Sequence, residues 1–149
     1  MPQVRRVKFP ETARLWANVR PGDFIDGYCV KSDLSPRQAA NVAFQLPKWA
    51  SALMALRNVI VRPFGLKTDT IDHENALFPT TYESETELIV GTDDTHLNFR
   101  ISILQQDNTI HMATWVHRNN LLGRLYLAVV MPFHVLIVRG CMKRVGKAA

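Results

Sequence analysis

The sequence predicts an α+β domain in which a curved antiparallel sheet is wrapped around a long C-terminal helix. Three observations predict this class. Strand-like segments follow one another without helices between them over residues 82–118, two short helices are expected after a first strand, and the chain ends in one long apolar helix. Helices segregated from a run of strands in this way favour an α+β domain over a doubly wound one. We expect a single domain over residues 1–149, with residues 1–20 as an N-terminal extension.

The N-terminal half is expected to contain one strand and two helices. Residues 22–31 are rich in aromatic and β-branched side chains, as is typical of a strand. Ser35 and Pro36 then offer an N-cap and a proline at the first helical position. A second helix is predicted after Pro47, because one helical face carries the apolar residues Trp49, Leu53, Leu56 and Ile60. Residues 67–81 are polar and irregular and are expected to form a long connection.

Three strands are expected in the second half, at residues 82–91, 96–105 and 109–118, joined by short turn-like segments. Such close succession predicts an antiparallel meander. The middle strand alternates most clearly, with one face formed by Leu97, Phe99, Ile101 and Ile103 and a polar opposite face. We therefore expect one face of the sheet to be buried and the other to lie in solvent.

The last helix is expected from Leu121 to about Arg144, with apolar residues around nearly its whole circumference. The apolar run between Arg124 and Arg139 has 14 residues, fewer than the roughly 20 that a spanning helix needs. We therefore expect a core helix surrounded by protein, and no transmembrane segment. A curved sheet around such a helix is a helix-grip architecture. Attachment to a membrane surface remains the alternative, through the basic residues Arg139, Lys143, Arg144 and Lys147.

Composition narrows the class of protein. The chain has 149 residues, of which 47% are hydrophobic and 21% charged, which excludes a disordered or low-complexity protein. The net charge is +5, but the basic residues are scattered, so no nucleic-acid partner is expected. Cys29 and Cys141 form no C-x-x-C pair and are expected to be reduced thiols. No apolar segment follows the basic N-terminus, which favours a cytoplasmic protein.

Several short strings in the sequence resemble a known family. They are Pro47-x-Trp49, Leu56-Arg57-Asn58, Phe64-Gly65-Leu66, Gly91-x-Asp93-Asp94-x-His96-Leu97-x-Phe99-Arg100, Gly123-Arg124-x-Tyr126 and Pro132-Phe133-His134. Together, over residues 20–142, they resemble an uncharacterised bacterial domain-of-unknown-function family that is similar to the START and polyketide-cyclase-like (SRPBCC) superfamily of helix-grip proteins. The resemblance implies a hydrophobic ligand cavity between sheet and C-terminal helix. It supplies no catalytic residue.

Some members of that family are similar to the C-terminal part of reductase-like proteins that carry a dinucleotide-binding domain. This chain has no G-x-G-x-x-G, so we expect no cofactor of that kind in it. Whether it partners a reductase-type protein stays open, as does its oligomeric state, with a homodimer as one arrangement.

Pro132 is the most informative residue of the last helix. A proline inside a helix removes one backbone hydrogen bond and crowds the carbonyl four residues earlier, so a bend is expected. We expect the bend to shape the cavity. Its ligand-binding residues are predicted to be Tyr126, Val130, Phe133 and His134 from the helix and Phe99, Ile101, Met112 and Thr114 from the sheet. The expected ligand is a small apolar or amphipathic molecule, such as a lipid, a polyketide-like compound or a pigment precursor.

The sequence leaves three functions open. The first is ligand binding without catalysis. The second is an enzyme of the same fold, cyclase- or isomerase-like, in which His134 or Tyr126 gives or takes a proton on a cyclic substrate. The third is a module that binds a protein or a membrane surface. No metal is expected, because the five histidines form neither H-E-x-x-H nor another close ligand pattern.

Overall fold

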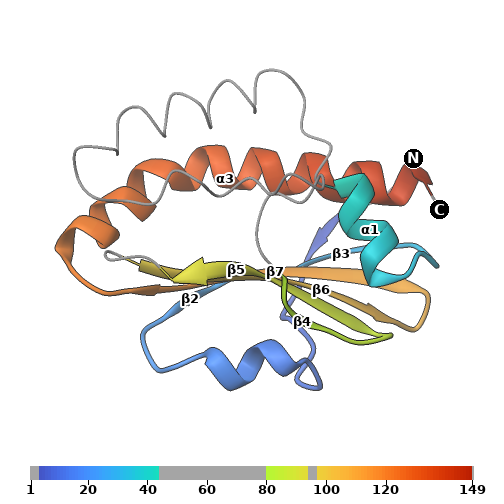
Figure 1. Ribbon diagram of the computed structural model, residues 1–149. Helices are drawn as coiled ribbons and strands as arrows, with labels where there is room; N and C mark the ends of the chain where they lie inside the picture. Colours follow the sequence, from blue (N-terminus) through green and yellow to red (C-terminus); the bar gives the residue numbers. More distant parts are fainter. Residues whose placement is uncertain (1–3, 44–79, 94–96, 149) are drawn as a thin grey trace.

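The computed structural model describes residues 4–43, 80–93 and 97–148 of the chain (Figure 1). Its centre is a seven-stranded antiparallel sheet with the strand order β1-β3-β7-β6-β5-β4, in which β2 also pairs with β7. The elements are β1 (Arg5–Arg6), the 3-10 helix η1 (Arg14–Asn18), β2 (Phe24–Ile25), β3 (Tyr28–Lys31), α1 (Pro36–Ala43), β4 (Thr80–Glu83), β5 (Glu87–Asp93), β6 (Leu97–Gln106), β7 (Thr109–Arg118) and α3 (Leu121–Ala148).

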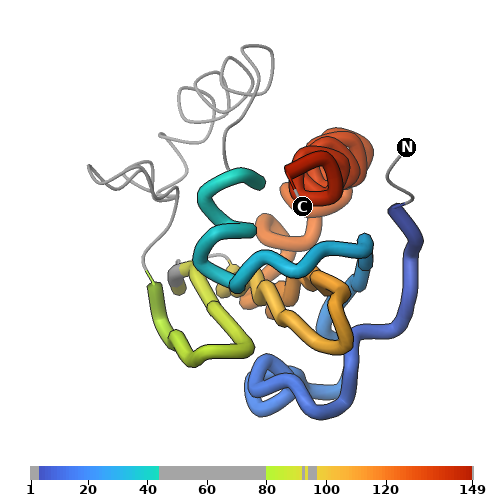
Figure 2. Tube along the Cα trace, turned by 90° about the vertical axis from the view of Figure 1, so that its right-hand side faces the viewer, coloured from blue at the N-terminus to red at the C-terminus, as the bar shows by residue number. Residues whose placement is uncertain are grey.

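The predicted α+β class is confirmed. Helices α3 and α1 lie on one face of the sheet, called the inner face, and the segment that contains η1 lies on the other, called the outer face (Figure 2). A curved antiparallel sheet with one long C-terminal helix is compatible with a helix-grip architecture. The second helix predicted after Pro47, and most of the predicted connection at 67–81, lie outside the described residues.

The observed bounds of the β6–β7 hairpin are close to the predicted ones. Strand β7 covers the predicted residues and β6 is shifted by one residue. Asp107 and Asn108 join the two strands with φ values of 53° and 55°, as a two-residue type I′ turn requires. The resulting register places Ile101 opposite Thr114 on the inner face.

Both other predicted strands are broken in two. The segment 22–31 divides into β2 and β3 at Asp26 and Gly27, where the Val7 N–H donates to the Gly27 carbonyl at 2.9 Å. A Cβ on residue 27 would lie 2.4 Å from the Val7 carbonyl oxygen, so only glycine permits this approach. The segment 82–91 divides into β4 and β5 at a turn in which the Ser84 N–H donates to the Glu87 carbonyl at 2.8 Å.

The inner face of the sheet holds the larger core. Side chains of β3, β5, β6 and β7 pack there against α1 and the second half of α3. The buried members of this core are Tyr28, Val30, Ala39, Ala40, Ala43, Leu88, Val90, Ile103, Ile110, Met112, Val138, Cys141, Met142 and Val145. The two cysteines are buried and unpaired, as predicted, and burial raises the pKa of the Cys141 thiol.

The prediction that the outer face lies in solvent is wrong. Residues of the N-terminal segment cover it and form a second core with Ile89, Leu104, Ala113 and Trp115, to which the segment contributes Phe9, Ala13 and Leu15. A buried carboxylate fastens the segment. Glu87 accepts hydrogen bonds from the Arg14 N–H at 2.7 Å, the Leu15 N–H at 3.2 Å and the Ser102 hydroxyl at 2.6 Å. Apolar residues without strand or helix periodicity therefore bury this face.

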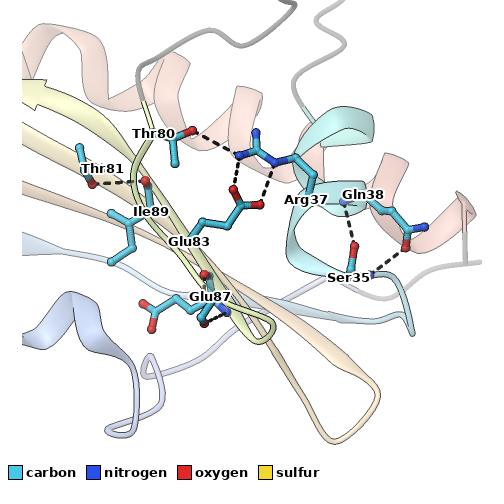
Figure 3. A network of polar contacts seen from close by, with 9 residues as sticks. Ser35, Arg37, Gln38, Thr80, Thr81, Glu83, Glu87 and Ile89 are labelled. Carbon is cyan, nitrogen blue, oxygen red and sulfur yellow. Dashed lines mark hydrogen bonds and ion pairs between the residues drawn. The ribbon is translucent and has the colours of Figure 1, made fainter.

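Helix α1 begins as predicted and is tied to the sheet edge. Ser35 and Gln38 form a reciprocal capping box, in which each side chain accepts the other residue's backbone N–H (Figure 3). On the same helix, the Arg37 guanidinium donates to both carboxylate oxygens of Glu83 on β4, at 2.7 and 3.0 Å. The ion pair raises the pKa of Arg37 and lowers that of Glu83. It holds α1 over β4.

The prediction that α3 is surrounded by protein is also wrong. The helix continues through Pro132, and Figure 1 shows that its first turns rise from the end of β7 before the rest runs across the sheet. Five large apolar side chains are exposed: Leu121 (70%), Leu125 (56%), Val129 (70%), Phe133 (45%) and Leu136 (59%). The sheet covers only one side of the helix. Among the described residues, α3 is the one helix long and apolar enough to span a membrane by length and composition.

Candidate functional site

The candidate site is centred on Asp26, at the break between β2 and β3. Its side chain is buried, with 3% of its surface exposed. The backbone N–H of Thr114 donates to Asp26 Oδ1 at 2.8 Å, and the backbone N–H of Asp26 donates to the Thr114 carbonyl at 3.2 Å. The carboxylate is thereby fixed against β7 and turned toward α3.

His134 of α3 completes a carboxylate–imidazole pair. Its Nε2 lies 2.9 Å from Asp26 Oδ2, and 17% of the histidine side chain is exposed. The ring of Phe24 lies edge-on to the imidazole, with ring centroids 6.3 Å apart. Because Asp26 binds β7 and α3 at once, the pair fixes the first half of α3 relative to the sheet.

The side-chain hydroxyl of Thr114 is the unusual group of the site. Thr114 is 6% exposed, lies on the inner face, and its buried Oγ1 has no hydrogen-bond partner among the described residues. The backbone of the same residue binds Asp26, so the hydroxyl is adjacent to the Asp26–His134 pair. Buried polar groups are nearly always hydrogen-bonded, and an exception calls for an explanation.

The inner face around this hydroxyl is only partly covered. Met112 is fully buried in the main core, whereas Phe99 and Ile101 on β6 are half-buried. On α3, Tyr126 and Val130 are also half-buried. Ile101, which lies opposite Thr114 on β6, therefore leaves accessible apolar surface next to the polar group formed by Asp26, Thr114 and His134.

The structure brings the predicted site residues together to different degrees. Thr114 and His134 meet at Asp26, and Met112 belongs to the inner core two residues along β7. Phe133 is 45% exposed, together with Val129 and Leu136, on the side of α3 that the sheet does not cover. Sequence reasoning missed Asp26 and Phe24. The one available signal was a carboxylate inside a strand-like segment.

A second carboxylate–imidazole pair lies near the first. Asp23 Oδ1 is 2.6 Å from His117 Nδ1, while Oδ2 accepts the Arg20 N–H and the Trp115 indole N–H, each at 2.9 Å. Burial alone would raise the pKa of Asp23, but the hydrogen bonds from His117, Arg20 and Trp115 together lower the pKa below 3.8. This pair fixes the end of β7 to the turn before β2.

An open hollow of about 360 Å³ lies beside the outer-face core rather than under α3. It is lined by Arg6, Val7, Lys8, Phe9, Trp16, Ile25, Asp26 and Gly27. Within residues 4–43, 80–93 and 97–148, no three His, Cys, Asp or Glu side chains converge in a way that could hold a metal ion.

The fold and site define an α+β protein in which a long helix lies across an antiparallel sheet and a buried carboxylate–imidazole pair joins the two. A family model described as "Protein of unknown function (DUF2867)" matches residues 19–141, and the chain belongs to this family. No curated protein and no solved structure shows significant similarity to the chain.

Proposed function

We propose that this protein binds a small apolar or amphipathic molecule between the inner face of the sheet and the first half of α3. The observation that carries the proposal is the buried Thr114 hydroxyl, which has no partner in the part of the chain that the structure describes. Leaving such a group unsatisfied costs about 1–3 kcal/mol. A ligand with a hydroxyl or carbonyl group at this place would recover that free energy.

The surroundings of Thr114 specify the rest of the ligand. Phe99, Ile101, Tyr126 and Val130 are half-buried, so an apolar ligand body would cover surface that the protein leaves accessible. Burial of apolar surface stabilises a complex by roughly 25 cal/mol per Å². A lipid, a polyketide-like compound or a pigment precursor has this combination of an apolar body and few polar groups.

The polar end of the ligand is expected to be uncharged. Each oxygen of Asp26 already accepts a hydrogen bond from the protein, one from the Thr114 backbone and one shared with His134. The carboxylate is therefore engaged, and the hydroxyl of Thr114 supplies the free donor and acceptor. Resemblance to the helix-grip ligand-binding superfamily supports the same function.

A second candidate function is acid–base catalysis on a bound cyclic substrate. The observation that favours it is the Asp26–His134 pair, since a carboxylate that orients an imidazole is a common element of general base catalysis. The Nε2 of His134 faces Asp26, and Nδ1 has no hydrogen bond to any described residue. His134 would be the catalytic residue, through Nδ1, and Asp26 its positioning residue.

The test is native mass spectrometry of the protein purified from its own host, followed by organic extraction. We expect an apolar small molecule to co-purify with the chain in a stoichiometric ratio. A bare mass that matches the chain, with no thermal shift across a panel of lipids and polyketides, would refute the proposal.

His134→Gln separates the two functions, because a glutamine amide can still donate to Asp26. Ligand retention by this variant supports binding alone, whereas conversion of the extracted ligand by the wild type and not by the variant supports an enzyme. His117→Gln, which makes the same exchange in the Asp23 pair, is the matched control and should behave as the wild type does in both assays.

A further inference from the structure

The side of α3 that faces away from the sheet is a continuous apolar surface. It is formed by Leu121, Leu125, Val129, Phe133 and Leu136, which we call the outer stripe. At a rise of 1.5 Å per residue the outer stripe extends over about 22 Å. Soluble monomers rarely expose contiguous apolar surface of this kind, and its presence indicates a binding surface.

The same side of the helix becomes basic beyond Leu136. Successive residues of an α-helix are about 100° apart, so Lys143 and Lys147 continue the line of the outer stripe, and both are exposed. Arg139 lies at the flank of the helix, where its guanidinium is 5.6 Å from the centroid of the Tyr28 ring on β3. Arg124 is exposed near the other end. Helix α3 contains no acidic residue. Along this side of the helix, the first half is therefore apolar, and the charged residues of the second half are all positive.

The second half of α3 cannot leave the protein. Val138, Cys141, Met142 and Val145 belong to the buried inner core, the last two with 0% of their surface exposed. Residues 121–137, which could leave it, span about 25 Å, short of the roughly 30 Å of a bilayer's hydrocarbon core. His134 within them is bonded to the buried Asp26. These contacts favour a helix that lies along a membrane over one that crosses it.

We propose that the outer side of α3 docks on an anionic lipid bilayer, with the helix parallel to the membrane plane. The outer stripe enters the boundary between headgroups and acyl chains, and Lys143 and Lys147 bind lipid phosphates or carboxylates. Interfacial helices combine these two contributions, apolar burial and attraction to anionic lipids. The inference does not depend on the ligand proposed above.

Charge disfavours a second copy of the chain as the occupant. In a two-fold symmetric dimer through this side, the helices would meet in parallel or antiparallel orientation. A parallel pair would place basic residues against basic residues. An antiparallel pair would place the basic half of each helix on the apolar half of the other. An anionic bilayer complements both halves.

The experiment is vesicle co-sedimentation of the full chain. The vesicles contain phosphatidylcholine alone, or phosphatidylcholine and phosphatidylserine in a three-to-one ratio. We expect binding to the anionic vesicles and at least about tenfold weaker partitioning onto the neutral ones. Val129→Gln with Leu136→Gln should reduce partitioning onto anionic vesicles by about tenfold or more. Its matched control is Val129→Leu with Leu136→Met.

The charge contribution is tested with Lys143→Gln and Lys147→Gln, matched to Lys143→Arg and Lys147→Arg. The glutamine variant should lose the preference for anionic vesicles by about tenfold, and the arginine variant should keep it. Point variants are needed because removal of residues 139–149 would delete core residues as well. Equal binding to both kinds of vesicle, or no binding to the anionic vesicles, would overturn the proposal. In the second case, a dimer that Val129→Gln and Leu136→Gln dissociate would identify a second copy of the chain as the occupant.

Discussion

Replacing Thr114 with valine should change the free protein and its complex in opposite directions. Valine has the shape of threonine without the hydroxyl, and this hydroxyl is buried with no partner in residues 4–43, 80–93 and 97–148. In the ligand-free protein the substitution removes a desolvation penalty of about 1–3 kcal/mol. Allowing for partial compensation, we expect the free energy of unfolding to rise by about 1 kcal/mol, which raises Tm by about 2–4 °C in a chain of this length.

The complex should weaken at the same time. Losing one hydrogen bond to the ligand costs about 1 kcal/mol, which corresponds to a roughly fivefold increase in Kd. The first quantity is measured by urea unfolding of the delipidated protein, and the second by titration with the extracted ligand.

Thr81→Val is the matched control for this substitution. The Thr81 hydroxyl donates to the Ile89 carbonyl at 3.2 Å. This variant should therefore lose up to about 1 kcal/mol and leave ligand affinity unchanged. If Thr114→Val destabilises the free protein by as much as Thr81→Val does, the hydroxyl is satisfied without a ligand and our reasoning about the site is wrong.

Three further substitutions test the contacts that position the site. Ser102→Ala should lower the free energy of unfolding by about 2–3 kcal/mol, because it leaves one oxygen of the buried Glu87 without its 2.6 Å hydrogen bond; urea unfolding measures it. Gly27→Ala should cost about 2 kcal/mol, because its Cβ would lie 2.4 Å from the Val7 carbonyl oxygen; faster amide hydrogen exchange at Val7 would confirm local separation. Asp23→Asn should cost about 1–2 kcal/mol at neutral pH. Since the folded-state pKa of Asp23 is below 3.8, this contribution is present above pH 3.8 and lost as the pH falls below it. Unfolding curves of variant and wild type should converge in acid.

The elements that depend on local pattern were predictable from the sequence. Strands β6 and β7 alternate regularly and are joined by Asp107 and Asn108, which adopt positive φ with little strain, so their bounds came within one residue. The break at Asp26 and Gly27 was not predictable, because it depends on the approach of Val7, about twenty residues earlier in the chain. Long-range contacts, rather than propensity, decide such details.

The same distinction applies to the site. His134 was predicted because it is a polar residue in an apolar helix, and Thr114 because it shares a strand face with Met112. Asp26 was missed because its partner His134 lies 108 residues further along the chain. No local pattern marks a carboxylate for such a partner. The packing of the N-terminal segment on the outer face was missed for a related reason, because its residues Phe9, Ala13 and Leu15 show no strand or helix periodicity.

Helix α3 shows why apolar residues around a whole helix do not by themselves place it inside a protein. Its inner side is apolar at Val138, Cys141 and Val145 because it packs on the sheet. Its outer side is apolar at Leu121 and Val129 although it is exposed. The hydropathy of the sequence does not distinguish the side of the helix that packs on the sheet from the side that is exposed. Only the three-dimensional structure does. A uniformly apolar sequence is therefore also compatible with a helix that packs on protein along one side and, on our proposal, binds a lipid surface along the other.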